Sequence, residues 1–178
     1  KLIVITNPMD VFTWYFAKHA GLDEGQVVGF GGLLDSRRFT VALSSMGIKE
    51  EGMVLGEHGE NQVPLFSNLS VDVPEAVREE VLLGLRGSSM PVIKGKGGTV
   101  FGPAYHIVNM MQKIERGEEF ICSLPANGAY GIDGCSIGLP AKVTRNGAKI
   151  NENLQLDDWE AGKLNAAAEF LTGLCRRV

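Results

Sequence analysis

Residues 119–156 constrain the fold most, because their pattern does not fit a helix. Short apolar runs, at 120–124 and 135–143, are separated by Asn-Gly and Asp-Gly pairs, which favour the tight turns of antiparallel hairpins. Much of the remaining chain has helical periodicity instead. We therefore predict an α+β domain with mixed or antiparallel strands.

The first residues follow a different pattern. Residues 2–6 (LIVIT) are continuously apolar and β-branched, which is typical of a strand covered on both faces. Asn7-Pro8 breaks this run, and residues 10–20 predict a helix that ends at Gly21. Strand, turn and helix make half of a βαβ unit. We therefore expect residues 1–21 to be the end of a parallel α/β domain, and residues 22–178 to be a separate α+β domain.

The remaining elements are predicted from apolar spacing and turn residues. Apolar side chains three and four residues apart predict helices at about 35–46, 74–87, 103–116 and 157–174. Asp157 and Glu160 have the spacing of a capping box at the start of the last helix. Short strands are expected at 26–30, 53–55 and 63–66. The glycine-rich stretch 94–102 predicts a flexible loop.

Charge and cysteine content exclude several classes of protein. The 17 basic and 21 acidic side chains give a net charge of −4 without a basic cluster, which argues against a nucleic-acid partner. No apolar run reaches the roughly 20 residues of a membrane span. The three cysteines, Cys122, Cys135 and Cys175, match neither a redox pair nor a zinc motif. We expect reduced thiols in a cytoplasmic protein with no membrane partner and no metal site.

His58 is the first candidate for chemistry. It lies in a Gly-Glu-His-Gly-Glu turn, where the flanking glycines leave room for a ligand. The ordinary pKa of an imidazole, about 6.5, suits proton transfer near neutral pH. The alternative is a surface histidine without a function. His19 and His106 are not expected to act as ligands.

Asp35 and Arg38 form the second candidate. They are three residues apart at a predicted helix start, so both can project from one side of the helix. The plain interpretation is an intrahelical ion pair worth about 0.3 to 0.5 kcal/mol. The functional one is that the carboxylate orients His58 and the guanidinium binds a substrate carboxylate. Arg37 projects elsewhere and is expected in solvent or at a subunit contact.

Asn7 is the third candidate, because ligands of open α/β sheets bind beyond the carboxyl ends of the strands. Its alternative role is to cap the helix that follows. Residues 29–34 (GFGGLL) begin like a dinucleotide fingerprint but have leucine at the last position. The chain therefore contains no nucleotide-binding fingerprint of its own.

Taken in order, these segments resemble the lactate/malate dehydrogenase family. Residues 6–10 (TNPMD) resemble the family's S/T-N-P-x-D segment, 34–39 (LDSRRF) its L-D-S-x-R-F segment, and 54–59 (VLGEHG) its V-L-G-E-H-G segment. Residues 96–99 (KGGT) followed by 101–104 (FGPA) are most similar to the archaeal-type, malate-preferring branch. The similarity extends through the closing helix, and implies the family's C-terminal catalytic domain.

The resemblance implies a role for each matching residue. His58 would be the proton donor and acceptor, Asp35 the carboxylate that orients it, and Arg38 the binding group for the substrate carboxylate. Asn7 would contact both the substrate oxygen and the nicotinamide, and Thr99 would line the substrate pocket. Thr6 would lie with Asn7 and His58 on the cofactor side.

The reaction implied by the resemblance is the interconversion of malate and oxaloacetate. No side chain supplies hydride, so NAD or NADP is required. In this family the glycine fingerprint and the specificity loop precede the first motif, so we expect this chain to lack most of the dinucleotide-binding half and to be inactive alone. Thr40 departs from the pattern, since many members have a second arginine there.

Three alternatives stay open. The enzyme could be an L-lactate dehydrogenase, since only the Thr99 region favours malate. The fragment could act only as an oligomerisation module, because family members are homodimers or homotetramers. An NAD-dependent glycosidase of the wider superfamily is disfavoured, because its metal-binding Cys and His residues have no counterparts at suitable spacing.

Overall fold

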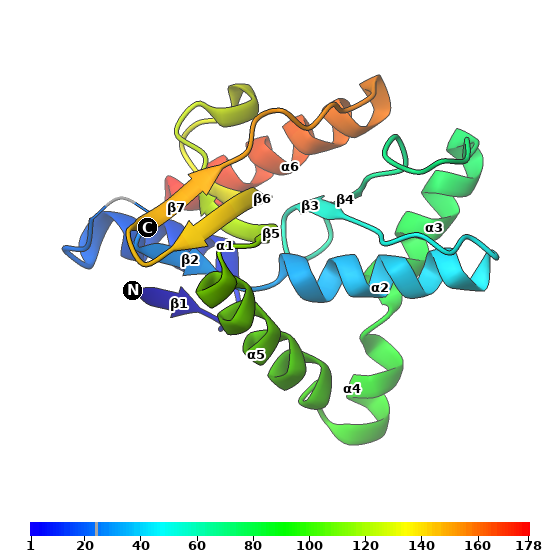
Figure 1. Ribbon diagram of the computed structural model, residues 1–178, viewed down its shortest axis with the longest axis horizontal. Helices are drawn as coiled ribbons and strands as arrows, with labels where there is room; N and C mark the ends of the chain where they lie inside the picture. The colour runs from blue at the N-terminus through cyan, green and yellow to red at the C-terminus, as the bar shows by residue number, and fades with distance from the viewer. Residues whose placement is uncertain (24) are drawn as a thin grey trace.

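The computed structural model describes residues 1–23 and 25–178. Its strands form one seven-stranded sheet in the order β1-β2-β5-β6-β3-β4, with β7 paired to β6 (Figure 1). The strands are β1 (Leu2–Val4), β2 (Val27–Gly29), β3 (Val54–Gly56), β4 (Gln62–Pro64), β5 (Glu119–Pro125), β6 (Ser136–Thr144) and β7 (Gly147–Ile150). The helices are α1 (Met9–His19), α2 (Gly32–Ser45), α3 (Glu75–Gly87), α4 (Met90–Lys96), α5 (Phe101–Arg116) and α6 (Asp158–Cys175), with a short 3-10 helix at Ala129–Gly131.

The sheet is mixed, as the sequence predicts. β1 and β2 are parallel, and the other pairs are antiparallel. β5 and β6 form the longest ladder, from Glu119↔Lys142 to Pro125↔Ser136. The hairpin between β6 and β7 turns at Arg145-Asn146, so Gly147 of the predicted Asn-Gly pair is already the first residue of β7, opposite Thr144. β1 continues the sheet of the following strands, and the predicted domain boundary after residue 21 stays a prediction.

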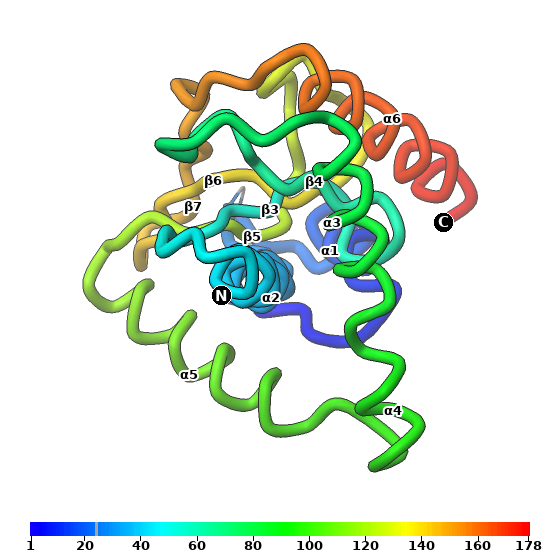
Figure 2. Tube along the Cα trace, turned by 90° about the vertical axis from the view of Figure 1, so that its right-hand side faces the viewer, coloured from blue at the N-terminus to red at the C-terminus, as the bar shows by residue number. Residues whose placement is uncertain are grey.

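Helices cover both faces of the sheet. α1 and α6 pack on one face and α2 and α5 on the other, so that α6 and α5 lie on opposite sides in Figures 1 and 2. β5 shows how one strand contributes to both cores. Ile121 belongs to the core beneath α1 and α6, whereas Phe120, Cys122 and Leu124 belong to the core beneath α2 and α5. This alternation follows from the two-residue period of a strand.

A third apolar core fixes α2 against β3. Phe39 and Leu43 of α2 are fully buried there with Val54 of β3. The rings of Phe39 and Phe66 meet edge to face, with their centroids 5.0 Å apart. Because β3 leads directly into the His58 turn, this packing sets the position of that turn relative to α2.

The stretch 94–102 is not the flexible loop that its glycines predict. α4 continues to Lys96, and α5 begins at Phe101, two residues before the predicted start. Pro103 is tolerated because the first-turn amides of a helix have no partner within the helix. Gly97 ends α4 with the left-handed φ of +77° that glycine adopts easily.

Two methionines at the predicted helical spacing do not reach the core. Met46 follows the end of α2 and is exposed, and Met111 is exposed on α5. Ile107, Met110 and Ile114 instead face the core, which is the stripe that helical geometry allows.

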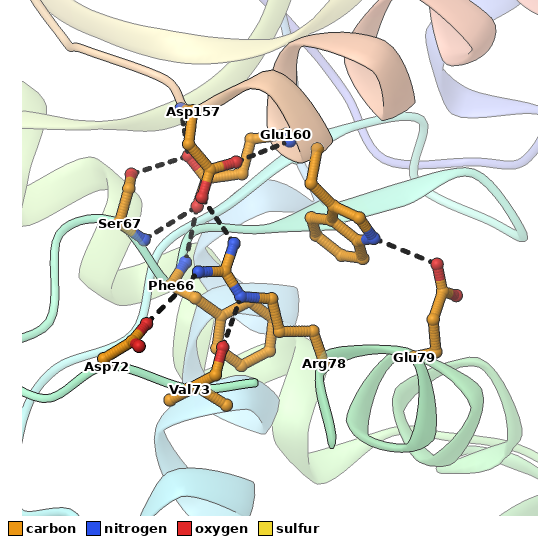
Figure 3. Close-up of polar contacts among 9 residues, drawn as sticks. Phe66, Ser67, Asp72, Val73, Arg78, Glu79, Asp157 and Glu160 are labelled. Atoms are coloured by element: carbon orange, nitrogen blue, oxygen red, sulfur yellow. Dashed lines mark hydrogen bonds and ion pairs between the residues drawn. The ribbon is translucent and has the colours of Figure 1, made fainter. Parts of the chain in front are cut away.

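The start of α6 is confirmed in detail. Asp157 accepts a hydrogen bond from the Glu160 backbone N–H, and the Glu160 side chain accepts one from the Asp157 N–H (Figure 3). Glu160 is also fully buried, and accepts hydrogen bonds from the backbone N–H groups of Phe66 and Ser67 at 2.7 and 2.8 Å. It therefore ties α6 to the segment after β4. Among the helices of residues 1–23 and 25–178, none is both long and apolar enough to cross a membrane.

Candidate active site

The turn that carries His58 connects the paired strands β3 and β4. Glu57 closes it by accepting hydrogen bonds from both the backbone N–H and the side-chain amide of Asn61, at 2.9 and 2.5 Å. Gly56 adopts a φ of +88°, which lets the chain reverse. The His58 side chain is only 17% exposed, so the interpretation as a simple surface histidine is wrong.

Asp35 joins the two other predicted residues. It lies in the first turn of α2 and is 3% exposed. Its Oδ2 is 2.5 Å from His58 Nδ1, and its Oδ1 accepts a hydrogen bond from Arg38 Nη1 at 3.0 Å. The intrahelical ion pair therefore exists, but the same carboxylate also holds the imidazole. An ionised carboxylate can only accept, so Nδ1 carries a proton and Nε2 faces away from Asp35.

The environment of His58 favours its charged form. Burial lowers the pKa of His58, but the hydrogen bond that its Nδ1–H donates to Asp35 and the negative charges of Asp35 and Asp10 outweigh burial. The nearby Arg38 opposes them weakly, and the net effect is a raised pKa. This group therefore holds a proton to a higher pH than an ordinary histidine.

Asp10 is a neighbour of His58 that the sequence analysis did not single out. It lies in the first turn of α1, is 3% exposed, and its Oδ2 accepts a hydrogen bond from the His58 backbone N–H at 2.8 Å. In the sequence, only its position in the Asn-Pro-x-Asp segment pointed to a role for Asp10 near the site. An acidic residue in a first helical turn is ordinarily explained by the helix dipole, which hid this contact.

Gly31, in the glycine-rich segment 29–32, is required by the packing of His58. A Cβ atom on Gly31 would lie 2.7 Å from His58 Cγ, and the φ of Gly31 is +138°. The imidazole thus packs directly on the backbone of residue 31. Only glycine allows this approach.

A cavity of about 510 Å³ lies between α2, α4 and the start of α5. Arg38 and Thr99 both line it, as expected for a substrate pocket. Lys96 lines it too, with its Nζ 5.2 Å from the centre of the Phe101 ring, although the sequence analysis assigned it no role. The cavity therefore presents two cationic side chains between apolar walls.

Thr6 and Asn7 do not lie in this cavity. Both are exposed in the turn after β1. α1 has Pro8 at its N-cap without a side-chain capping hydrogen bond, so the alternative role of Asn7 as the helix cap is wrong. The structure leaves the Asn7 amide accessible at the carboxyl end of β1.

The other histidines lie elsewhere. His19 ends α1 and packs against Tyr15, with ring centroids 4.6 Å apart. His106 is half-buried on α5, where burial and the positive charges of Arg37 and Arg38 lower its pKa. Arg37 is exposed, as expected.

An oriented histidine, its carboxylate and an arginine thus lie together, and of these three side chains Arg38 lines the cavity. A family model for the lactate/malate dehydrogenase alpha/beta C-terminal domain matches residues 33–175. The chain belongs to the lactate/malate dehydrogenase family. The resemblance seen in the sequence motifs is therefore confirmed.

Individual members of the lactate/malate dehydrogenase family are similar to this chain along nearly its whole length. A malate dehydrogenase of Haloferax volcanii is 36% identical over 180 residues, which cover 95% of this chain and 59% of that protein. An L-lactate dehydrogenase of Macrococcus caseolyticus is 30% identical and covers 97% of this chain and 60% of its own. The solved structure of the Archaeoglobus fulgidus malate dehydrogenase in complex with NADH superposes with a TM-score of 0.88 at 34% identity, covering 99% of this chain and 61% of that one. The chain thus spans about 60% of the relatives that it matches.

Proposed function

We propose that this chain is the catalytic domain of an NAD(P)-dependent L-malate dehydrogenase. One observation carries the proposal: a single buried carboxylate, Asp35, binds both His58 and Arg38, and Arg38 lines a cavity of about 510 Å³. A proton donor and a cation for an organic acid are thus held in a fixed relation. This is what the reduction of a 2-oxo acid requires.

His58 performs the proton transfer in this proposal. Asp35 accepts from Nδ1 and orients the ring, so Nε2–H of the imidazolium donates to the oxygen of the substrate carbonyl. In the reverse direction, neutral His58 accepts the proton of the substrate hydroxyl at the same atom. The raised pKa of His58 extends its protonated form to higher pH than in an ordinary histidine, which favours proton donation during reduction.

Arg38 and Lys96 support a dicarboxylic substrate. Only Nη1 of Arg38 is engaged by Asp35, which leaves further N–H groups for the carboxylate beside the carbonyl. Lys96 provides a second positive charge in the same cavity, suited to the distal carboxylate of oxaloacetate or malate. Thr99 supplies a hydroxyl to this pocket. L-lactate dehydrogenase is the runner-up activity, and a relative of that name is 30% identical.

The cofactor, when bound, supplies the hydride, and the A. fulgidus neighbour in complex with NADH supports an NAD-type group. Thr6 and Asn7 fit its nicotinamide end, because both are exposed beyond β1 and the Asn7 amide can donate and accept. Together with His58 they would hold this end. Because this chain spans about 60% of its relatives, we place most of the remaining cofactor contacts outside it and expect the chain alone to show little turnover.

An assembly role is the second candidate. Phe101, Tyr105, Val108 and Met111 follow one another at helical spacing on α5, and each is more than half exposed. Such an apolar stripe favours burial against the other half or another subunit, consistent with a homodimer or homotetramer.

Three unpaired cysteine thiols support a cytoplasmic enzyme.

The test is a fusion of the H. volcanii dinucleotide-binding half ahead of Lys1, assayed by NADH oxidation with oxaloacetate. The fusion should reduce oxaloacetate, and His58→Asn should lower the rate by about 10² to 10⁴-fold, the usual contribution of general acid catalysis. His19→Asn is the matched control, because His19 lies at the far end of α1 and should leave the rate unchanged. Full activity in His58→Asn would refute the proposal.

A further inference from the structure

The charges around His58 do not balance through Asp35 alone. Asp35 binds two cationic groups, Arg38 through Oδ1 and His58 through Oδ2, but carries only one negative charge. With His58 protonated, these three side chains have a net charge of +1. Because Asp35 is buried and the His58 ring is largely so, a further negative charge close by would offset this excess positive charge.

Asp10 lies where that charge is needed. Its Oδ2 accepts from the His58 backbone N–H, and it is as deeply buried as Asp35, at 3% exposure. Its Oδ1 and the neighbouring Ser123 Oγ are both buried, and within residues 1–23 and 25–178 neither has a partner other than the polar contact between them. Helix capping does not explain this buried carboxylate, because α1 has no side-chain cap.

We propose that Asp10 is a positioning residue for His58, and that its carboxylate is the second negative charge that balances the imidazolium. The inference rests on the proposed role of His58 as the proton donor. The four-residue cluster is then neutral when His58 is protonated, and has a net charge of −1 when His58 has given up its proton. Asp10 thereby favours the form that donates, while its hydrogen bond fixes the backbone that carries the ring.

The other titratable groups near Asp10 are consistent with this assignment. Burial raises the pKa of Asp10 to about 6, the Ser123 hydroxyl and the His58 amide and charge lower it, and Glu57 raises it. Burial raises the pKa of Cys135 and Cys175 on the same side, so both thiols are neutral at physiological pH. Asp10 is therefore ionised at neutral pH, and the raised pKa of His58 favours the imidazolium form beside it.

The test follows the NMR titration of the His58 imidazole in the 178-residue chain, which requires no turnover. Asp10→Asn has the same shape and retains an acceptor for the His58 amide, but removes the charge. We expect the pKa of His58 to fall by about one unit, the shift typical of a nearby opposite charge, which is a tenfold loss in proton affinity. In the fused enzyme, the loss of oxaloacetate reduction with rising pH should move to lower pH by the same amount.

Thr13→Val is the matched control, because Thr13 is buried on the same helix and uncharged. It should leave the His58 titration unchanged. An unchanged titration in Asp10→Asn would overturn the proposal. If that variant does not fold, the wild-type chain decides: the His58 amide signal must titrate together with the Asp10 carboxyl carbon near pH 6, and independent titrations would refute the contact. This result is separate from the His58→Asn activity test, so each proposal can fail alone.

Discussion

The imidazole of His58 packs directly against the backbone of Gly31. A methyl group added at residue 31 would lie 2.7 Å from His58 Cγ and 2.9 Å from Nδ1, the atom that bonds Asp35. Gly31 immediately precedes α2, which carries Asp35, so one short segment supplies both the partner of the ring and the surface on which it rests.

Gly31→Ala should therefore displace the imidazole. We expect a loss of about 1–3 kcal/mol in the free energy of unfolding from overpacking, beyond the cost of the left-handed backbone. In the fused enzyme the rate should fall about 10²-fold, because a shift near 1 Å misaligns the proton donor. Urea unfolding and the NADH assay measure the two effects.

Gly47→Ala is the control for backbone strain. Gly47 has a φ of +82°, and a Cβ there would meet no atom within 4 Å. This variant should lose only the stability that the left-handed backbone costs and should retain its rate. Equal rate losses in both variants would exclude the steric explanation.

Lys96→Met should change substrate preference. It keeps the length of the side chain but removes the second positive charge of the cavity. In the fused enzyme we expect KM for oxaloacetate to rise about tenfold or more, the value of one charged hydrogen bond, with KM for pyruvate unchanged. Lys94→Met is the matched control on α4, since Lys94 does not line the cavity. Equal changes for both substrates would argue against a distal carboxylate at Lys96.

Asp10 should make the stability of the chain depend on pH. Its pKa is raised from 3.8 to about 6, so the folded chain binds this proton more tightly than the unfolded chain. Its contribution to the free energy of unfolding therefore decreases as the pH rises from about 4 to 6 and then levels off. Urea unfolding of the wild type and Asp10→Asn at several pH values should show this difference between the two proteins. A difference that increases with pH over this range would contradict the raised pKa of this buried carboxyl group.

His58 changes the free energy of unfolding at higher pH than Asp10 does. Its pKa is raised, so its contribution to stability is complete below the ordinary value of 6.5 and decreases as the pH rises through the folded pKa. His58→Gln should remove this second decrease, and because it also removes the positive charge that lowers the pKa of Asp10, the first decrease should extend to higher pH.

Glu160→Gln should destabilise the link between α6 and the segment after β4. Glu160 accepts four hydrogen bonds, from the backbone N–H groups of Phe66, Ser67 and Asp157 and from the Ser67 hydroxyl (Figure 3). The amide of the glutamine side chain would point its own N–H groups at some of these donors. We expect a loss of about 1–3 kcal/mol in the free energy of unfolding. Glu169→Gln, exposed on the same helix, should be close to neutral. A neutral Glu160→Gln would show that these bonds contribute little.

Local patterns in the sequence were sufficient for much of the fold. The hairpin at Asn146, the Asp157 and Glu160 capping box and the Asp35–Arg38 pair each depend on residues within one turn, whose geometry the backbone dictates. The glycine-rich stretch 94–102 was the main error, because composition does not show that helices can use glycine at their ends.

Residue types and family motifs in the sequence indicated the candidate catalytic side chains, among them His58, Asp35 and Arg38. The contacts that these side chains make with distant residues depend on the packed fold. Asp10 is 48 residues from His58 along the chain, and Glu160 is 94 residues from Phe66. These contacts follow from the strand order β1-β2-β5-β6-β3-β4, which brings distant segments together through packing, and no local periodicity specifies that order.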